Sequence, residues 1–426
     1  MGLWPTGGLW RHPDFLRLWS AQTISQFGTQ ISQLALPLAA ILVLNASAFE
    51  VALLGAVEFL PFLLFALPAG VWVDRLRRKP ILVVADAGRA ALLTSIPLAY
   101  AFDALTIWQL YVVGFLVGVC TVFFDVAYQS YLPSLIERGN LVEGNSKLEV
   151  SRSGAQLAGP GLAGVLVAAI TAPYAILFDA VSFVWSAALV FRIRRPETVP
   201  EPTAQPNMRR ELMEGLRYLL GHWFQRPVAI AVAISNFFTT LGFSIILVYA
   251  VRELDMSPAL IGVVLAVGNV GWLVGAVAAT RLSGTIGVGR TIVGSAIVFG
   301  PSMLLVPLAP QSFPVPFLVA SLVLLSFGAV VFNVTGLSFT QAIVPDRMLG
   351  RLNATRRFIV WGVIPLGSLT GGTLASFIGL RGTLWVGAAG ACFSFVPLLL
   401  SPIRSIGRME DAVREHAPVS APVADA

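Results

Sequence analysis

Ionisable side chains inside apolar stretches are the groups in this sequence best placed to do chemistry. Glu58 lies near the middle of one such stretch, and Asp125 lies in another. A carboxyl in an apolar medium can bind a proton and release it again. We therefore take Glu58 first and Asp125 second as candidates for carrying a proton. The alternative for Glu58 is a permanently neutral, hydrogen-bonded carboxyl.

A second pair of ionisable residues lies on one predicted helix. Asp86 and Arg89 are three positions apart, so their side chains share a helix face and can form an ion pair. Asp125, on the next predicted helix, can join them. A structural ion network is the interpretation that we favour for these three residues, with a part in proton coupling as the alternative.

Four polar residues form a stripe on the first predicted helix. At about 100° per residue they fall within about 60° of one another, so they share a face. Lipid does not solvate such a face, which therefore lines a cavity or meets another polar helix. The stripe consists of Gln22, Gln26, Thr29 and Gln33. The candidates for the facing wall are Asn236, Thr240 and Asn333, with Trp361 as an aromatic wall. Hydrogen bonding between helices and core packing are the competing explanations.

Glycine and proline crowd one further predicted helix, at Gly154, Gly159, Pro160, Gly161 and Gly164. Small residues let helix backbones approach closely, and proline bends a helix. We interpret Gly159, Pro160 and Gly164 as a hinge or a leak-proof seam. Close packing alone is the alternative.

A short basic connection, G-V-W-V-D-R-L-R-R-K, runs from Gly70 to Lys79 between two apolar stretches. Asp74 can meet the N-terminal end of a helix or a nearby arginine, and such a contact would act as a gate. The cations can instead serve only to set topology and to bind anionic lipid headgroups. The gating candidates are Gly70, Asp74, Arg75, Arg78 and Lys79.

The composition is that of a membrane protein. Apolar residues make up 56% of the 426 residues, charged residues 12%, and the mean hydropathy is +0.81. A soluble domain carries about twice that charged fraction. The net charge of +6 does not indicate nucleic-acid binding, because the cations lie in short loops between apolar runs. Scattered histidines and the lack of a phosphate-cradling loop motif predict no metal and no cofactor.

Twelve apolar windows are long enough to cross a bilayer. Lipid cannot hydrogen-bond free backbone groups, so each window must be helical, and the uninterrupted runs exclude the alternation of a β-barrel. We therefore predict an all-α integral membrane protein. The windows are 15–44, 51–73, 80–100, 105–129, 150–170, 174–192, 227–250, 258–281, 290–309, 315–341, 353–378 and 381–401.

The positions of the cations predict the orientation in the cell (inner or plasma) membrane. All Lys and Arg residues except Arg89, Arg252 and Arg381 fall in the N-terminus, the even-numbered connections and the tail. Positively charged loops stay on the cytoplasmic side, so both termini are expected to be cytoplasmic.

The longest connection divides the chain into two halves. Its prolines predict an extended first part, and leucines at helical spacing near residues 212–220 predict an amphipathic helix on the inner leaflet. The predicted segments are a cytoplasmic N-terminus 1–14, a six-helix bundle 15–192, the linker 193–226, a second six-helix bundle 227–401 and a disordered cytoplasmic tail 402–426.

The two halves repeat each other at an offset of about 207–208 residues. Ala52–Gly55 corresponds to Ala259–Gly262, and Phe124–Val126 corresponds to Phe332–Val334. A near-constant offset across several helices argues against chance. Parallel repeats of this kind are a recognised plan for secondary transporters.

Together these features resemble the major facilitator superfamily, and most closely its drug and siderophore exporter branch, which includes macrolide-efflux and enterobactin exporters. The motifs that carry the resemblance are Gly70–Lys79, Glu58–Pro61 and Gln156–Gly164. The resemblance implies the major facilitator fold, with 12 transmembrane helices in two pseudo-symmetric six-helix bundles. The third motif is similar to one associated with antiporters, which favours export.

Two departures from that branch limit what the resemblance implies. The arginine that its drug antiporters usually place in the fourth helix is missing from residues 110–126, so no proton-coupling role is carried over for it. In the second half, Arg281 stands where the first half has Asp74, which implies gates of different chemistry.

We therefore expect a secondary active transporter and no enzyme. The expected activity is proton-coupled export of a drug-like or siderophore-like small molecule by alternating access, as in multidrug resistance. An importer of a small nutrient and a non-transporting membrane sensor or scaffold are the alternatives. The expected partners are the small-molecule substrate, protons and membrane lipids, and the chain is expected to be a monomer.

Overall fold

The computed structural model describes residues 8–73, 75–197 and 208–407. Within these ranges the chain is helical and contains no strand. Asp74, the prolines at 200–206 and the tail from 408 onward lie outside the described residues.

The helices are α1 (Pro13–Leu42), α2 (Ala48–Val73), α3 (Arg78–Ala101), α4 (Ile107–Leu135), α5 (Leu141–Ile170), α6 (Ala172–Phe191), α7 (Met208–Gly221), α8 (Gln225–Arg252), α9 (Pro258–Gly268), α10 (Val270–Ile286), α11 (Val288–Ser302), α12 (Leu305–Leu308), α13 (Val315–Ile343), α14 (Asp346–Cys392) and α15 (Val396–Leu399), with short 3₁₀ turns at Gly8–Arg11, Arg138–Asn140, Phe393–Phe395 and Pro402–Ser405.

Ten helical stretches in the described residues are long and apolar enough to cross a membrane. One of them, Ile359–Leu399, covers 41 residues. It contains Gly379, where φ is 77° and the helix is interrupted, so two of the predicted windows are joined there. The 30-residue α1 is not among the ten. The all-α membrane fold is therefore confirmed, and the count of twelve helices stays a prediction.

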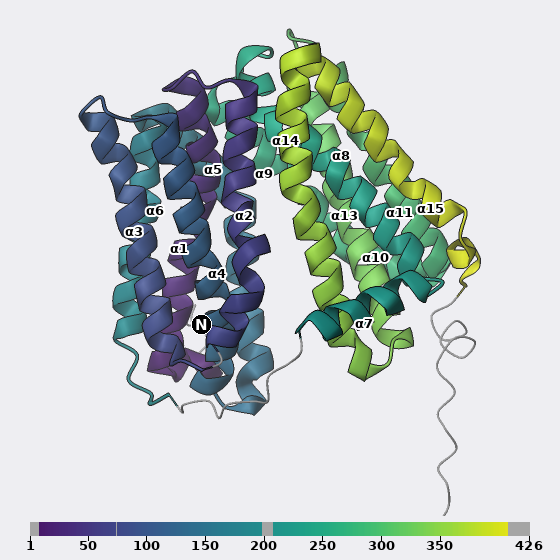
Figure 1. Ribbon diagram of the computed structural model, residues 1–426, viewed down its shortest axis with the longest axis horizontal. Coiled ribbons are helices and arrows are strands. Elements are labelled where there is room, and N and C mark those ends of the chain that lie inside the picture. The colour runs from purple at the N-terminus through teal and green to yellow at the C-terminus, as the bar shows by residue number, and fades with distance from the viewer. Residues whose placement is uncertain (1–7, 74, 198–207, 408–426) are drawn as a thin grey trace, which may run out of the picture. The chain divides into compact units, whose positions relative to one another are not determined.

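The first compact unit is built mainly from α1 to α6 (Figure 1). Within it α1 packs against α5 and α6, α3 packs against α4 and α6, and α2 packs against α4. Large apolar side chains from α1, α3 and α4 form its buried core, among them Leu18, Leu82, Phe124 and Tyr131. The long apolar helices pack side by side in this unit. Polar side chains between them have no access to water and therefore need hydrogen-bond or ion-pair partners within the unit.

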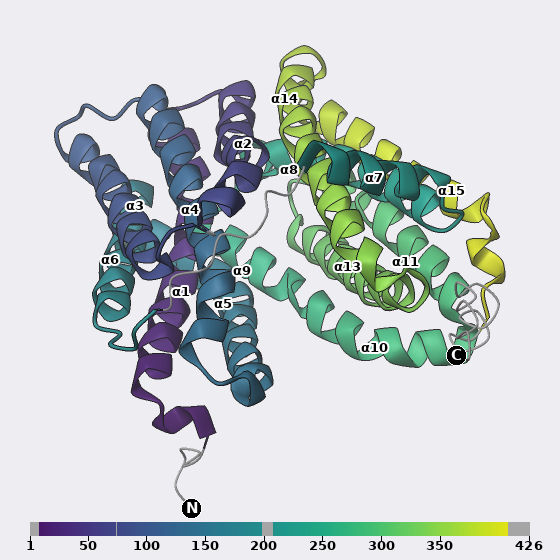
Figure 2. The same ribbon diagram turned by 60° about the horizontal axis from the view of Figure 1, so that its bottom comes forward.

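The second compact unit contains α7, much of α8, and α10 to α13, together with parts of α14 and the segment that follows it. In this unit α10 and α11 both pack against α13 (Figure 2). Its buried core includes Phe224, Ile292, Phe339, Leu352 and Ile403.

The units differ from the predicted halves at two places. The first unit also includes Ser244–Val267 and Ser368–Leu380, which we assigned to the second bundle by sequence. Specific contacts explain the grouping. Arg252 donates a hydrogen bond to the carbonyl oxygen of Ala46 at 2.7 Å, and Ser368 Oγ donates one to the carbonyl oxygen of Ala52 at 2.6 Å.

Helix α7 lies where an amphipathic helix was predicted in the linker, and part of its apolar face packs against the second unit. Leu219 is 1% exposed and belongs to the core of the second unit. Glu214 forms an ion pair with Arg351 of α14. A Cβ atom on Gly215 would lie 2.7 Å from the carbonyl oxygen of Arg351, so glycine permits the close approach of the two helices. Met213 and Leu220 remain exposed.

The Gly215 contact leads to a stability prediction. We expect Gly215→Val to lower the stability of the detergent-purified protein by about 1–3 kcal/mol, because the added side chain forces the α7 and α14 backbones apart. Gly221→Val is the matched control, since a Cβ at Gly221 would have no described neighbour within 4 Å. Thermal unfolding followed by tryptophan fluorescence measures both variants. Equal melting temperatures for the two would contradict the docking of α7 on α14.

Candidate functional site

A buried arginine organises the polar interior of the first unit. Arg89 of α3 is 5% exposed and forms an ion pair with Asp86 on the preceding turn. The rings of Phe124 and Phe183 lie against the guanidinium, with their centroids 4.3 and 4.1 Å from Arg89 Cζ. Cation–π contacts of this kind are strengthened when water is excluded. The ion pair predicted from the spacing is present, and α4 and α6 hold it in place.

Two more carboxyls interact electrostatically with Arg89. Asp125 of α4 is exposed, whereas Asp179 of α6 is 2% exposed. Asp179 Oδ1 accepts a hydrogen bond from Ser182 Oγ at 3.1 Å. A Cβ atom on Gly28 of α1 would lie 2.5 Å from Asp179 Oδ1, so this glycine makes room for the carboxyl. The cluster of Asp86, Arg89, Asp125 and Asp179, called here the Arg89 cluster, therefore spans α3, α4 and α6 and abuts α1.

Asp179 was not among the candidate site residues of the sequence analysis. The structure instead buries it in the Arg89 cluster. A carboxyl within an apolar window was the available signal, and it was the same signal that singled out Glu58. Its partner on another helix could not be identified from spacing.

Glu58 of α2 is half-buried beside α4. A Cβ atom on Gly114 would lie 3.1 Å from Glu58 Cγ, so the glutamate packs directly over this glycine. In the part of the chain that the structure describes, no group donates a hydrogen bond to the Glu58 carboxyl and no cation pairs with it. The hydrogen-bonded alternative finds no protein partner there.

A cavity of about 250 Å³ lies within the second unit, between α8, α11, α13 and α14. Asn236 and Asn333, which we predicted to share a polar wall, both line it, together with Phe299 and Phe332. Arg356 of α14 also lines the cavity. The sequence reasoning counted this arginine only as a loop cation that sets topology. Its position inside the window 353–378 was the signal that it belongs to a helix.

The other predicted cavity residues have different surroundings. On α1, Gln22 is buried, Gln26 and Thr29 are half-buried and Gln33 is exposed, so the exposure of the polar face increases from Gln22 to Gln33. A Cβ atom on Gly367 would lie 3.1 Å from Thr240 Cβ, so Thr240 lies against a helix contact. Trp361 follows Val360, which lines the cavity. The pairing of the α1 face with Asn236 and Asn333 stays a prediction.

The glycines of α5 lie at close helix contacts. A Cβ atom on Gly159 would lie 2.5 Å from Gln30 Cβ of α1, and one on Gly164 would lie 2.9 Å from Gly262 Cα of α9. Pro160 is buried, and its carbonyl oxygen would lie 2.5 Å from a Cβ on Gly262. These distances agree with the close-packing interpretation, and the role of a hinge stays a prediction.

The basic connection is held by an acidic residue that we did not predict. The Glu197 carboxylate accepts hydrogen bonds from the backbone N–H groups of Arg78 and Lys79 at 2.7 and 3.1 Å. It therefore compensates the positive N-terminal end of α3. Arg75 is exposed, and a Cβ on Gly70 would meet none of the described residues within 4 Å, so Gly70 does not lie at a close contact with them.

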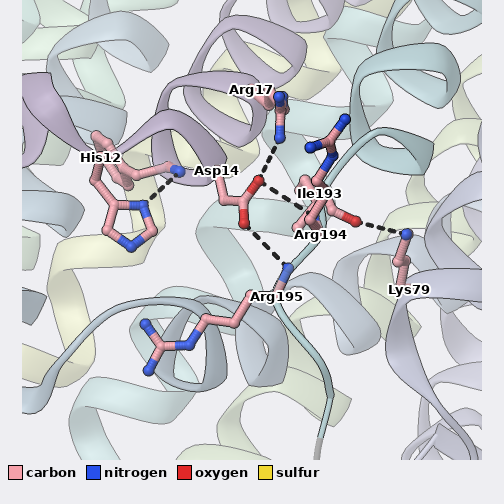
Figure 3. A network of polar contacts seen from close by, with 8 residues as sticks. His12, Asp14, Arg17, Lys79, Ile193, Arg194 and Arg195 are labelled. Carbon is pink, nitrogen blue, oxygen red and sulfur yellow. Dashed lines mark hydrogen bonds and ion pairs between the residues drawn. The ribbon is translucent and has the colours of Figure 1, made fainter.

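A second carboxylate ties the start of α1 to the segment after α6 (Figure 3). Asp14 accepts hydrogen bonds from the backbone N–H groups of Arg194 and Arg195 at 3.2 and 3.0 Å, and from Arg17 Nη1 at 2.5 Å. Burial opposes ionisation of this carboxyl, but the three hydrogen bonds outweigh burial and hold the pKa of Asp14 below its ordinary value. Lys79 Nζ donates to the carbonyl oxygen of Ile193 at 2.7 Å, which joins α3 to the same segment.

Comparisons with known proteins show which family this chain resembles. The sequence profile of the major facilitator group described as transmembrane secretion effector matches residues 8–425. The uncharacterised MFS-type transporter YfiS of Bacillus subtilis is 26% identical over 387 residues, which are 88% of each chain. The multidrug efflux pump Tap of Mycolicibacterium fortuitum is 25% identical over 389 residues, which are 88% of this chain and 91% of that protein. Macrolide efflux protein A of Streptococcus pyogenes is 25% identical over 206 residues, which are 48% of this chain and 51% of that protein.

Solved structures show the same fold at low identity. A bacterial homologue of the iron transporter ferroportin, in an inward-facing state, matches with a TM-score of 0.70 and 17% identity over 92% of this chain and 99% of that chain. The nucleoside transporter NupG matches with a TM-score of 0.67 and 12% identity over 91% of this chain and 97% of that chain. These likenesses establish the fold alone.

The Asp14 hydrogen bonds lead to a prediction about pH. We expect Asp14→Asn to lower stability by about 1 kcal/mol near neutral pH, because the amide loses charge-assisted hydrogen bonds while Arg17 is partly solvated. Since the folded-state pKa lies below the ordinary 3.8, the carboxylate stabilises the fold above pH 3.8, and this contribution is lost as the pH falls through the folded-state value. The stability difference from wild type should therefore be constant near neutral pH and shrink below about pH 4.

Unfolding midpoints measured in detergent across this pH range test the prediction. Glu149→Gln is the control, because its pair with Arg152 is exposed and should contribute little. A difference between wild type and Asp14→Asn that grows on acidification would contradict the assignment.

Proposed function

This chain belongs to the transmembrane secretion effector family of the major facilitator superfamily, and from that premise we propose that it exports a drug-like or siderophore-like small molecule in exchange for protons. Members of the superfamily are membrane transporters and not enzymes. Alternating access, the direction of transport and the cytoplasmic location of both termini are parts of the proposal.

The Arg89 cluster is the observation that carries proton coupling. Three carboxyls interact with one guanidinium in it, so full ionisation would leave excess negative charge between apolar helices. Such a charge is costly when it is buried. A proton on one carboxyl removes part of the excess. The exposed Asp125 is the member that can exchange a proton, and the buried Asp86 can keep its pair with Arg89.

Glu58 is the other proton carrier in the proposal and remains its first candidate. No ion pair or hydrogen bond with a described residue fixes its charge, so its carboxyl is free to gain or lose a proton as the surrounding helices move. Glu58 packs on Gly114 of α4, the helix that also carries Asp125. Movement of α4 would therefore change the surroundings of both carboxyls, which gives a physical route for coupling.

The cavity of the second unit supplies a place for part of the substrate. Amide groups of Asn236 and Asn333 can orient a polar group, and Phe299 and Phe332 can cover an apolar one. Its volume of about 250 Å³ is below the 300–1,000 Å³ or so that is typical of sites for drug-sized ligands, so it would hold a portion of such a molecule. The names of two relatives, a macrolide efflux protein and a multidrug efflux pump, support export.

Proteoliposomes containing a pH-sensitive dye test the proposal. We expect addition of a fluorescent dye to cause proton movement with the wild-type protein, and Glu58→Gln to reduce it about tenfold or more, as when a proton carrier is removed. Asp125→Asn should reduce coupling as well, and Glu149→Gln serves as the matched surface control. Unchanged coupling in both the Glu58 and Asp125 variants would remove these carboxyls from the mechanism. Substrate movement in the opposite direction would favour an importer.

A further inference from the structure

The cavity in the second unit is lined by a cation and, among the described residues, by no anion. Arg356 lines it together with the polar residues Ser235, Asn236, Asn333 and Ser394. None of the described residues that line the cavity is an aspartate or a glutamate. The described lining residues thus supply hydrogen-bond donors and one positive charge among apolar side chains.

Arg356 differs in this respect from other arginines of the fold. Arg351, on the same helix, is paired with Glu214, and Arg89 is paired with Asp86. Arg252 and Arg381 donate to backbone carbonyl oxygens. Among the described residues, Arg356 has neither an ion-pair partner nor a hydrogen-bond acceptor. It is half-buried, so water compensates its charge only in part.

From this arrangement we propose that the cavity is an anion-binding subsite in which Arg356 pairs with a carboxylate or similar oxyanion of the transported molecule. The proposal rests on the proposed function, because it makes the anion a part of the substrate. It adds a substrate class, namely molecules with an acidic group attached to an apolar or aromatic body.

The chemistry of the lining residues suits such a ligand. A guanidinium offers a planar pair of N–H donors that matches the two oxygens of a carboxylate. The amide of Asn236 or Asn333 and the hydroxyl of Ser235 can donate to the remaining lone pairs. Phe299 and Phe332 can then cover the hydrocarbon next to the acid group. These contacts need a guanidinium, so lysine would reproduce the charge but lose the paired geometry.

The same residues disfavour a cationic ligand. No described lining residue carries a negative charge, so a cationic drug would face Arg356 without a partner. Repulsion between the Arg356 guanidinium and a cationic ligand lowers the affinity for that ligand, and such repulsion is a common source of binding specificity. The subsite therefore distinguishes acidic substrates from basic ones of similar shape.

Binding to the full-length protein in detergent tests the proposal without a proton gradient. The probes are 2-naphthoate and its neutral analogue 2-naphthamide, measured by thermal shift and by isothermal titration. We expect naphthoate to bind wild type about 10-fold or more tightly than naphthamide. Arg356→Gln should weaken naphthoate binding about 10- to 100-fold, with an intermediate loss for Arg356→Lys. Arg351→Gln, on the same helix, should leave naphthoate binding unchanged.

Two results would overturn the proposal. One is equal affinity of wild type for naphthoate and naphthamide, a comparison that needs no variant to fold. The other is an equal loss of naphthoate binding in Arg356→Gln and Arg351→Gln. A lipid phosphate offers the same oxyanion chemistry, so a third arm titrates phosphatidylglycerol into delipidated protein. Arg356-dependent binding of that lipid, with no binding of naphthoate, would make this a lipid site and also overturn the proposal.

The outcome can be separated from that of the proposed function. Charge-selective binding without any coupled flux in proteoliposomes would leave the subsite standing and refute the exporter. Proton-coupled dye export in a protein that binds naphthoate and naphthamide equally would leave the exporter standing and refute the subsite.

Discussion

The free-energy cost of an uncompensated charge between apolar helices is the constraint on which this structure depends. At Arg89 the constraint is met by Asp86 and by the rings of Phe124 and Phe183, so one guanidinium holds α3, α4 and α6 together. Removing Asp86 would leave the guanidinium of Arg89 without its ion-pair partner in an apolar interior. Proton binding changes the same balance, which is why a charge cluster can serve both packing and coupling.

Two ionisable side chains in apolar surroundings have no compensating partner among the described residues. Within the described ranges, no cation or hydrogen-bond donor lies beside the Glu58 carboxyl, and no anion lies beside the Arg356 guanidinium. Each group is then available to a ligand that can supply the missing charge, a proton for Glu58 and an oxyanion for Arg356. The two groups belong to different compact units. A transporter built in this way would keep its coupling ion and part of its substrate on separate helices, and movement between helices would link them.

Much of the local structure could be predicted from the sequence, because it depends on spacing along one helix. Runs of apolar residues located the helices, since only a helix satisfies its own backbone in lipid. The three-residue spacing of Asp86 and Arg89 was sufficient to predict their ion pair. The amphipathic pattern around 212–220 predicted the helix that the structure has at Met208–Gly221. The sequence also selected Asn236 and Asn333 as polar groups in apolar helices, and both line one cavity.

Contacts between segments far apart in the chain were decided only by the tertiary structure. Asp179 lies 90 positions from Arg89 and Glu197 lies 119 from Arg78, and no periodicity relates such pairs. The docking of α7 depends on Gly215 meeting the backbone of α14, which requires the crossing of two helices to be known. The sequence places Arg356 among the cations near a loop, and only the packing of α8, α11 and α13 shows that it lines a cavity. Spacing along a helix determines which side chains share a face, whereas the packing of helices determines what that face meets.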